Sequence, residues 1–150
     1  MPLFLRHHWI VRGHILIVIV MITVFTNGVF DILHRGHVEL LNFAKSKGDF
    51  LIVGLNSDES VKRLKGESRP INNQEERSFL LTNLKSVDMV IIFNEDTPLE
   101  LIEGLKPDIL VKGGDYKAEE VVGYDIVPQT IICPYVDGHS TTNIIQKVLK

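Results

Sequence analysis

From residue 21 onward, short apolar segments rich in β-branched residues alternate with segments whose apolar residues recur at helical spacing. The apolar segments predict strands at 22–25, 50–55, 89–93, 109–112 and 130–133. The segments with helical spacing predict helices at 37–46, 74–84, 99–105 and 141–149. Strands that alternate with helices are typical of a parallel sheet covered on both faces. We therefore expect an α/β fold, a Rossmann-like three-layer α/β/α sandwich with a five-stranded parallel sheet.

Two local signals set the expected helix ends. Lys47 and Gly48 predict the end of the first helix, because glycine is common just after a helix. Thr97 and Pro98 predict the start of a later helix, with the Thr97 hydroxyl as its cap and Pro98 in its first turn. In open parallel sheets, ligands bind beyond the carboxyl ends of the strands, where the strand order reverses. We therefore expect functional residues in the loops after the first and fourth strands.

The first 20 residues differ in composition from the rest of the chain. They contain Arg6 and Arg12 but none of the 19 acidic residues. The apolar run at 15–25 is eleven residues long, whereas a membrane-spanning helix needs about 20 apolar residues. The small-residue cleavage pattern of a secretory signal is also missing. We expect one domain over 21–150, preceded at 1–20 by an extension or a mis-called start.

Overall charge and cysteine content narrow the classes of function. The chain has 150 residues, with 16 Lys and Arg against 19 Asp and Glu, a formal net charge of −3 at pH 7. This balance gives no general basic surface for nucleic acid. The single cysteine, Cys133, excludes an intramolecular disulfide and a cysteine-rich metal cluster, and its apolar strand favours a buried structural thiol. We expect a cytoplasmic protein without a nucleic-acid or membrane partner.

His34 and His37 follow the first predicted strand and lie at the start of a helix. Free backbone N–H groups and the helix dipole favour an anion there, and imidazoles donate hydrogen bonds to phosphate oxygens. Gly36 lets a ligand approach the backbone closely. Two ordinary surface histidines and a metal-binding pair are the alternative interpretations, although no Cys ligand or His-Glu-x-x-His pattern supports a metal.

Other phosphate-binding and nucleophile motifs are absent from the sequence. No Gly-x-Gly-x-x-Gly follows the first strand, which disfavours a dinucleotide oxidoreductase, and no Gly-x-x-x-x-Gly-Lys-Ser/Thr supports a P-loop kinase. No Gly-x-Ser-x-Gly supports a serine nucleophile. Phosphate binding, if it occurs, must therefore depend on the histidine segment and on nearby cations.

A group of basic residues follows the second predicted strand: Lys62, Arg63, Lys65 and Arg69. We expect a cationic loop here, broken by Gly66, which either closes over a triphosphate or forms a solvated charged surface. Lys65 is the strongest candidate of the four for phosphate contact. Arg77, in the helix that follows, has the same two interpretations.

Two further segments complete the candidate site. Lys112, Gly113, Asp115 and Tyr116 follow the fourth strand, opposite the histidine segment, and indicate either a nucleotide contact or a glycine turn. The segment 137–142 precedes the last helix, and its hydroxyls either cap that helix or hold a phosphate.

These motifs resemble a known superfamily. The segment 28–37, Gly-Val-Phe-Asp-Ile-Leu-His-Arg-Gly-His, is similar to the His-x-Gly-His signature of cytidylyltransferase-like nucleotidyltransferases, and Ser140-Thr141-Thr142 resembles their second signature. Class I aminoacyl-tRNA synthetases share the first signature, but their Lys-Met-Ser-Lys-Ser-type loop is missing. The segments 53–58, 64–66, 69–72, 95–99 and 111–116 resemble the heptose 1-phosphate adenylyltransferase domain at the carboxyl end of RfaE/HldE proteins. Val29 and His139 depart from that group, which commonly has cysteine at both positions.

The resemblance implies an enzyme that joins ATP and D-glycero-β-D-manno-heptose 1-phosphate to give ADP-heptose and pyrophosphate. It implies Mg²⁺ bound mainly through the nucleotide phosphates and a separate sugar kinase that supplies the sugar phosphate. A homodimer is a further expectation, because symmetric dimers are common. His34, His37 and Lys65 would be the catalytic residues. The nucleotide-binding residues would be Asn27, Gly28, Phe30, Gly36, Arg77, Lys112, Gly113, Asp115, Ser140, Thr141 and Thr142. A cytidylyltransferase acting on glycerol 3-phosphate or another phosphorylated alcohol, and a non-catalytic nucleotide sensor, are the alternatives.

Overall fold

The computed structural model describes residues 7–11, 14–18, 20–134 and 139–150. At its centre is a five-stranded parallel sheet with the strand order β5-β4-β3-β6-β7. The sheet strands are β3 (Thr23–Gly28), β4 (Phe50–Asn56), β5 (Met89–Phe93), β6 (Ile109–Gly113) and β7 (Gln129–Cys133). The helices are α1 (Arg35–Lys45), α2 (Asp58–Lys65), α3 (Gln74–Thr82), α4 (Leu99–Leu105), the 3₁₀ turn η1 (Ala118–Glu120) and α5 (Thr141–Val148). The expected Rossmann-like α/β/α architecture is confirmed.

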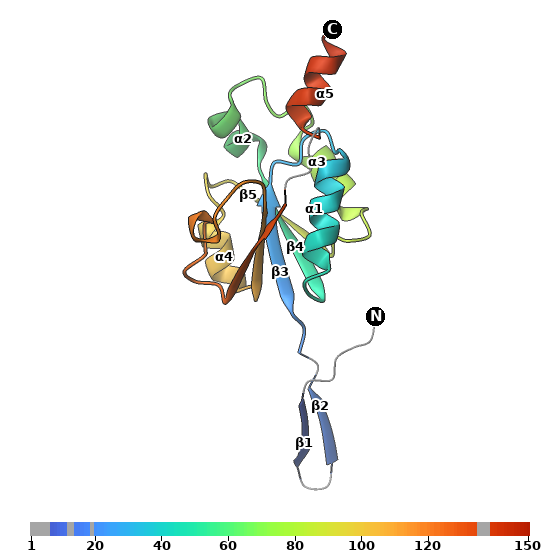
Figure 1. Ribbon diagram of the computed structural model, residues 1–150, viewed down its shortest axis with the longest axis vertical. Helices are drawn as coiled ribbons and strands as arrows, with labels where there is room; N and C mark the ends of the chain where they lie inside the picture. Colours follow the sequence, from blue (N-terminus) through green and yellow to red (C-terminus); the bar gives the residue numbers. More distant parts are fainter. Residues whose placement is uncertain (1–6, 12–13, 19, 135–138) are drawn as a thin grey trace.

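Buried apolar side chains on the two faces of the sheet hold the three layers together. On one face, Leu41 and Ala44 of α1 and Leu81 of α3 pack with Val24 and Leu51 of the sheet. On the other face, Ile102 of α4 packs with residues of β3, β4 and β6. Figure 1 accordingly shows α1 and α3 on one side of the sheet and α4 on the other.

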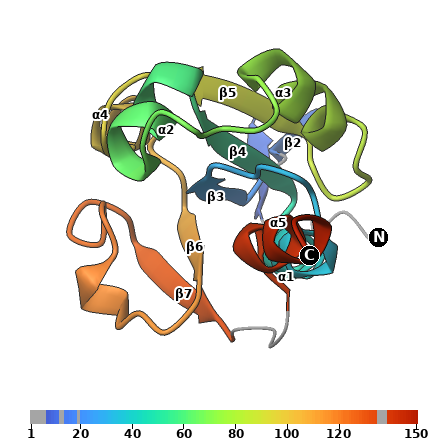
Figure 2. The ribbon, with the colours of Figure 1, turned by 90° about the horizontal axis from the view of Figure 1, so that it is seen from above.

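The strand order reverses at β3, which lies between β4 and β6. Val24 of β3 pairs with Leu51 of β4 on one side and with Ile109 of β6 on the other. The chain runs from β3 to β4 and β5 on one side of β3, and then crosses to β6 and β7 on the other side. The loops after β3 and β6 therefore lead away from each other in opposite directions. The view from above shows α5 over α1 (Figure 2), and in Figure 1 helices α2 and α5 lie beyond the carboxyl end of β3. This is the place where open α/β sheets bind their ligands.

Two local predictions were wrong. Lys62, Arg63 and Lys65 belong to helix α2 and not to a loop. The Ser57 side chain accepts a hydrogen bond from the backbone N–H of Ser60, and acidic residues in the first turn and basic residues in the last turn suit the helix dipole. At α4, Pro98 itself is the N-cap, and no cap hydrogen bond from a side chain supports the expected role of Thr97.

A separate antiparallel hairpin precedes the sheet. Strands β1 (His7–Val11) and β2 (His14–Val18) pair with each other and form their own two-stranded sheet. The hairpin lies beyond the amino end of β3, away from α5 (Figure 1). Among the described residues, no helix has the length and apolar character needed to cross a bilayer. The expected domain start at Met21 stays a prediction.

Candidate active site

A pocket of about 950 Å³ lies at the carboxyl ends of the sheet strands. The loops after β3 and β6, the end of α2 and the start of α5 form its walls. The lining includes all but one of the catalytic and nucleotide-binding residues that the resemblance implies: Asn27, Gly28, Phe30, His34, Gly36, His37, Lys65, Lys112, Gly113, Asp115, Ser140, Thr141 and Thr142. Residues 137 and 138, at the start of the candidate segment 137–142, lie outside the described residues. Segments from both ends of the domain thus meet at one pocket.

The two histidines of the first signature form a stacked pair. Their ring centroids are 3.7 Å apart, with an angle of 24° between the ring planes. His34 is the N-cap of α1, and its backbone N–H donates to Nδ1 of His37 at 3.4 Å. Phe30 packs against His37 on another side, with a centroid distance of 5.3 Å. Because Nδ1 of His37 is an acceptor, the neutral ring carries its proton on Nε2.

Both imidazoles are held toward their neutral form. Burial, together with the neighbouring His34, lowers the pKa of His37 to about 4, although Asp31 acts in the opposite direction. Burial and His139 also lower the pKa of His34. A neutral imidazole still has one N–H donor. The pair can therefore donate hydrogen bonds to an anion without first taking up protons.

Gly36 lies between the histidines in sequence and provides the space for the His34 ring. A Cβ atom at Gly36 would lie 2.9 Å from Cε1 and 3.0 Å from Nδ1 of His34, and 3.2 Å from Cβ of His139. Contacts this short would force the His34 ring to move. The glycine of the His-x-Gly-His signature is thus required by the position of the histidine side chain.

The loop between β3 and α1 has a left-handed backbone at two residues that are not glycine. Phe30 and Ile32 both have φ of 49°. Such conformations cost of order 1–3 kcal/mol each and persist where the surroundings hold them. Asp31 lies between them, and its carbonyl oxygen accepts a hydrogen bond from the hydroxyl of Thr141. The start of α5 is therefore fastened to the histidine loop.

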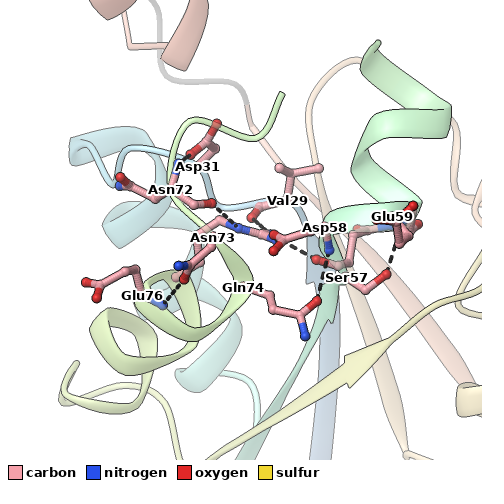
Figure 3. A network of polar contacts seen from close by, with 12 residues as sticks. Val29, Asp31, Ser57, Asp58, Glu59, Asn72, Asn73, Gln74 and Glu76 are labelled. Carbon is pink, nitrogen blue, oxygen red and sulfur yellow. Dashed lines mark hydrogen bonds and ion pairs between the residues drawn. The ribbon is translucent and has the colours of Figure 1, made fainter. Parts of the chain in front are cut away.

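The carboxylate of Asp31 binds a second segment of the chain, 69–72. Its Oδ2 accepts from the backbone N–H of Ile71 at 2.7 Å and from Nε of Arg69 at 3.2 Å. Its Oδ1 accepts from the backbone N–H of Asn72 at 3.0 Å. Figure 3 shows Asp31 and Asn72 on neighbouring segments of this network. The histidine loop is thus held in place from the segment that precedes α3.

Arg77 does not lie in the pocket, so the structure does not support the predicted phosphate contact. Its side chain is fully buried, and four of its five N–H donors are used. The acceptors are the carbonyl oxygens of Asn72, Val29 and Asn56 and the Asp58 carboxylate. Val29, Asp58 and Asn72 come together in Figure 3. Arg77 instead ties α3 to the carboxyl ends of β3 and β4 and to the start of α2.

Two lysines of the pocket come from different elements of the fold. Lys65 is exposed at the end of α2, and Lys112 lies at the end of β6, with its Nζ 5.8 Å from the ring centroid of Tyr116. Burial lowers the pKa of Lys112. Among the described residues, neither lysine takes part in an ion pair. Both amino groups are therefore available to an anionic ligand.

The sequence predicts no role for one polar residue of this pocket, Asp31, and favours Lys65 over another, Arg69. Asp31 lies within the first signature, but an acidic residue in a phosphate-binding segment gives no signal for phosphate. Arg69 was grouped with the other basic residues, and Lys65 was preferred to it. Among the described residues, no group of three or more His, Cys, Asp and Glu side chains could hold a metal ion.

A parallel sheet with this pocket at its reversal point is the architecture of nucleotide-binding Rossmann-like domains. Residues 25–147 match the family model described as cytidylyltransferase-like, and the chain belongs to that family. The family expected from the two signatures is therefore confirmed.

Curated relatives extend this result. The chain is 60% identical over 125 residues to the bifunctional protein HldE of Aliarcobacter butzleri, a match that covers 83% of this chain and 26% of the relative. It is 56% identical over 125 residues to the bifunctional protein HldE of Helicobacter pylori strain P12, covering 83% and 27%. The chain spans about a quarter of the length of these relatives.

Solved structures agree with the fold. The lipopolysaccharide core biosynthesis protein of Thermoplasma volcanium is 33% identical, with a TM-score of 0.67, and the match covers 78% of this chain and 99% of that one. The pantoate-beta-alanine ligase of Francisella tularensis is 19% identical, with a TM-score of 0.53, over 76% and 59% of the two chains. The second comparison supports the fold alone.

Proposed function

We propose that this protein transfers the adenylyl group of ATP to D-glycero-β-D-manno-heptose 1-phosphate, giving ADP-heptose and pyrophosphate. The observation that carries the proposal is the stacked pair of neutral histidines at the start of α1, facing a pocket at the point where the strand order reverses. Family membership and the 60% identity to an HldE protein support the reaction class. The choice of sugar rests on the resemblance of the middle motifs to the HldE domain.

In the proposed reaction, an oxygen of the sugar 1-phosphate attacks the α-phosphorus of ATP in line. A new P–O bond forms as the bond from the α-phosphorus to the bridging oxygen breaks, and pyrophosphate leaves with that electron pair. The attacking phosphate is already anionic at neutral pH, so no general base is required. Catalysis then depends on positioning the two substrates and on stabilising the charge of the phosphoryl oxygens.

The histidine pair supplies uncharged donors for those oxygens. Nε2–H of His37 is free of the hydrogen bond that Nδ1 makes to the backbone of His34, and both residues line the pocket. The N-terminus of α1 adds backbone N–H groups and the positive end of its dipole. Lys65 and Lys112, which also line the pocket, add positive charge.

Mg²⁺ enters the proposal as a partner of the triphosphate. The described residues form no cluster of three or more potential metal ligands, so the phosphate oxygens would supply most of its coordination. When bound, the ion would neutralise charge on the triphosphate and on the leaving pyrophosphate. The contribution of this chain is to position the nucleotide through the residues of the pocket.

The cellular setting follows from the proposed substrates. A sugar 1-phosphate is the product of a phosphorylating enzyme, so a sugar kinase acts before this step. ATP as a substrate favours the cytoplasm. A homodimer stays a prediction.

A cytidylyltransferase acting on glycerol 3-phosphate or another phosphorylated alcohol is the second candidate, and the cytidylyltransferase-like family description favours it. The same pocket residues would serve the same chemistry with another base and another acceptor. A nucleotide sensor is a third candidate, but it would have no use for the catalytic histidine pair.

The proposal is tested by Mg²⁺-dependent pyrophosphate release from the purified protein. ATP and CTP are each paired with D-glycero-β-D-manno-heptose 1-phosphate and with glycerol 3-phosphate. We expect pyrophosphate release only in the pairing of ATP with the heptose phosphate. Release with CTP and glycerol phosphate would contradict the proposed substrates and support the proposed mechanism. Nucleotide binding without release in any pairing would favour the sensor.

The matched variants are His37→Ala and Arg35→Gln. Loss of one donor to a developing oxyanion typically costs about 2.7 to 4 kcal/mol, roughly a hundredfold to a thousandfold in rate. We expect that loss for His37→Ala. Arg35 does not line the pocket, and its side chain, 72% exposed, pairs with Glu39. Arg35→Gln should therefore retain activity, and His37→Ala with full turnover would contradict the assignment.

A further inference from the structure

The guanidinium of Arg69 lies at the wall of the pocket, where a buried carboxylate holds it. Nε of Arg69 and Oδ2 of Asp31 are 3.2 Å apart, and the two side chains are 15% and 0% exposed. Both residues line the pocket. The ion pair thus lies largely out of solvent and beside the proposed site of the phosphates.

Asp31 orients the guanidinium by one edge. The carboxylate already accepts hydrogen bonds from the backbone N–H groups of Ile71 and Asn72. Arg69 adds a single bond through Nε, so its two Nη groups stay outside the pair. No hydrogen bond joins either Nη group to another described residue. Neither Nη group is among the buried polar atoms that lack a partner, so both are accessible from the pocket that Arg69 lines. Charged donors that are accessible and unpaired suit an oxyanion as their partner.

Two other arginines of this fold use their guanidinium donors in hydrogen bonds to protein acceptors. Arg77 is fully buried, uses four of its five donors on protein acceptors and lies outside the pocket. Arg63 is half-exposed and donates to the Asp96 carboxylate and to the carbonyl oxygen of Asn94. Arg69 combines burial, a place in the pocket lining and unused donors, a combination that neither of the other two has.

Asp31 also connects Arg69 with the histidines. It lies between the two left-handed residues of the histidine loop, Phe30 and Ile32. A carboxylate fixed to the segment 69–72 therefore restrains that strained loop and the arginine together. The Asp31 side chain therefore helps to fix the position of Arg69 relative to His37.

We propose that Arg69 binds the phosphates of the nucleotide through its Nη groups, and that Asp31 is the residue that positions it. This inference rests on the proposed function, because it takes a nucleoside triphosphate as the ligand. The planar guanidinium fork suits two phosphate oxygens at once, which a lysine cannot match.

The test measures binding of inorganic tripolyphosphate by calorimetry, so that no turnover is required. We expect wild-type protein to bind tripolyphosphate and Arg69→Gln to bind it about tenfold to a hundredfold more weakly. Arg69→Lys, which keeps the charge but not the fork, should fall between them. Arg35→Gln, outside the pocket, should bind as the wild type does. Circular dichroism and thermal unfolding check that each variant is folded.

A double-mutant cycle tests the role of Asp31. If Asp31 acts on this ligand through Arg69, Asp31→Asn weakens tripolyphosphate binding in the wild type but adds little to Arg69→Gln. A merely structural Asp31 would weaken binding equally in both backgrounds, which would overturn its positioning role. Should Asp31→Asn fail to fold, Arg69→Lys and Arg69→Gln still decide the role of Arg69.

Two results would overturn the proposal for Arg69. One is a folded Arg69→Gln protein that binds tripolyphosphate as tightly as the wild type. The other is wild-type protein that binds no tripolyphosphate. Binding that depends on Arg69 in a protein without pyrophosphate release would support this inference and contradict the proposed function alone, so the two failures are distinguishable.

Discussion

The backbone N–H of His34 donates to Nδ1 of His37 over 3.4 Å, and the two imidazole rings stack with their centroids 3.7 Å apart. This hydrogen bond assigns the proton of the neutral His37 ring to Nε2, the nitrogen left for a ligand. Protonation of Nδ1 would break the bond and place a positive charge beside another imidazole. The geometry therefore agrees with the lowered pKa of His37.

The first prediction concerns stability as a function of pH. The pKa of His37 is about 4 in the folded protein and has the ordinary value of 6.5 when the chain is unfolded. Between these values the unfolded chain binds more protons, so the free energy of unfolding falls as the pH drops from 6.5 toward 4. His37→Gln removes the part of this dependence that comes from His37, whereas His34, whose pKa is also lowered, keeps its own part. Urea unfolding at about pH 7 and about pH 4.5 should show a larger loss for the wild type than for the variant.

Proton NMR gives the matching direct reading. The His37 ring signals of the wild-type protein should titrate near pH 4, and those of unfolded protein near 6.5. Two results together would show that the stacked pair does not keep the His37 ring neutral. In the folded protein the ring would titrate at the value of the unfolded chain, and acid would destabilise the wild type and His37→Gln equally.

Gly36→Ala separates activity from stability. Its Cβ would lie 2.9 Å from Cε1 of His34, so the ring must leave its position. Displacement of a catalytic group by about 1 Å can cost as much as about a hundredfold in rate. Helix propensity favours alanine over glycine by roughly 0.5–1 kcal/mol, which offsets part of the contact strain. We expect a folded protein with strongly reduced kcat, measured by pyrophosphate release and thermal unfolding.

Gly104→Ala is the control for this variant. Gly104 is in helix α4, and a Cβ there would meet no heavy atom within 4 Å. This variant should be as stable as the wild type or more so, with full activity. Equal activity of the two alanine variants would exclude the steric role assigned to Gly36.

Arg77 should affect stability and not phosphate binding. Arg77→Met removes four hydrogen bonds from fully buried donors and leaves three carbonyl oxygens without this partner. Loss of such a buried network costs about 3 kcal/mol or more in the free energy of unfolding. The exposed ion pair of Arg35 and Glu39 provides the comparison, since Arg35→Gln should lower the free energy of unfolding by less than about 1 kcal/mol. Unfolding by urea measures both variants.

Binding of tripolyphosphate by folded Arg77→Lys protein decides whether Arg77 has a structural role or contacts phosphate. If the structural role holds, the folded variant binds tripolyphosphate as tightly as the wild type. An unchanged stability combined with weaker binding would restore the phosphate contact that the sequence predicted.

Deletion of residues 1–20 should leave the domain intact. The described strands β1 and β2 pair only with each other, and they make no pairing with the five-stranded sheet. The start of β3 is held from within the domain, because the backbone N–H groups of Ile22 and Thr23 donate to the carboxylates of Asp49 and Asp108, each at 2.8 Å. We expect an unchanged thermal midpoint and unchanged turnover. A lower midpoint for the shortened protein would show that the segment supports the domain.

The sequence predicted the elements whose signal is local. The apolar runs that became the sheet are consecutive residues, and the histidine pair could be read from its spacing and its place after the first strand. Helix α2 was missed because it carries few apolar residues: its buried positions are Ser60 and Val61, between exposed charges. Its start signal, Ser57 followed by two acidic residues, was present in the sequence.

The roles of the arginines depend on contacts between distant segments. Arg77 and Val29 are 48 residues apart in the chain, and Arg69 and Asp31 are 38 apart. A basic residue in an amphipathic segment has the same sequence signature whether its partner is solvent, a phosphate or a buried carbonyl oxygen. The sequence therefore identified the basic residues around the pocket but could not assign Arg77 to the interior and Arg69 to the pocket wall.

The central claim, attack on the α-phosphorus of ATP, is tested most directly by the fate of labelled phosphate. The protein is incubated with Mg²⁺, the heptose 1-phosphate and ATP labelled either at the α- or at the γ-phosphorus. The account predicts that the α-label appears in the sugar nucleotide and the γ-label in pyrophosphate. Appearance of the γ-label on the sugar or in free inorganic phosphate would contradict it.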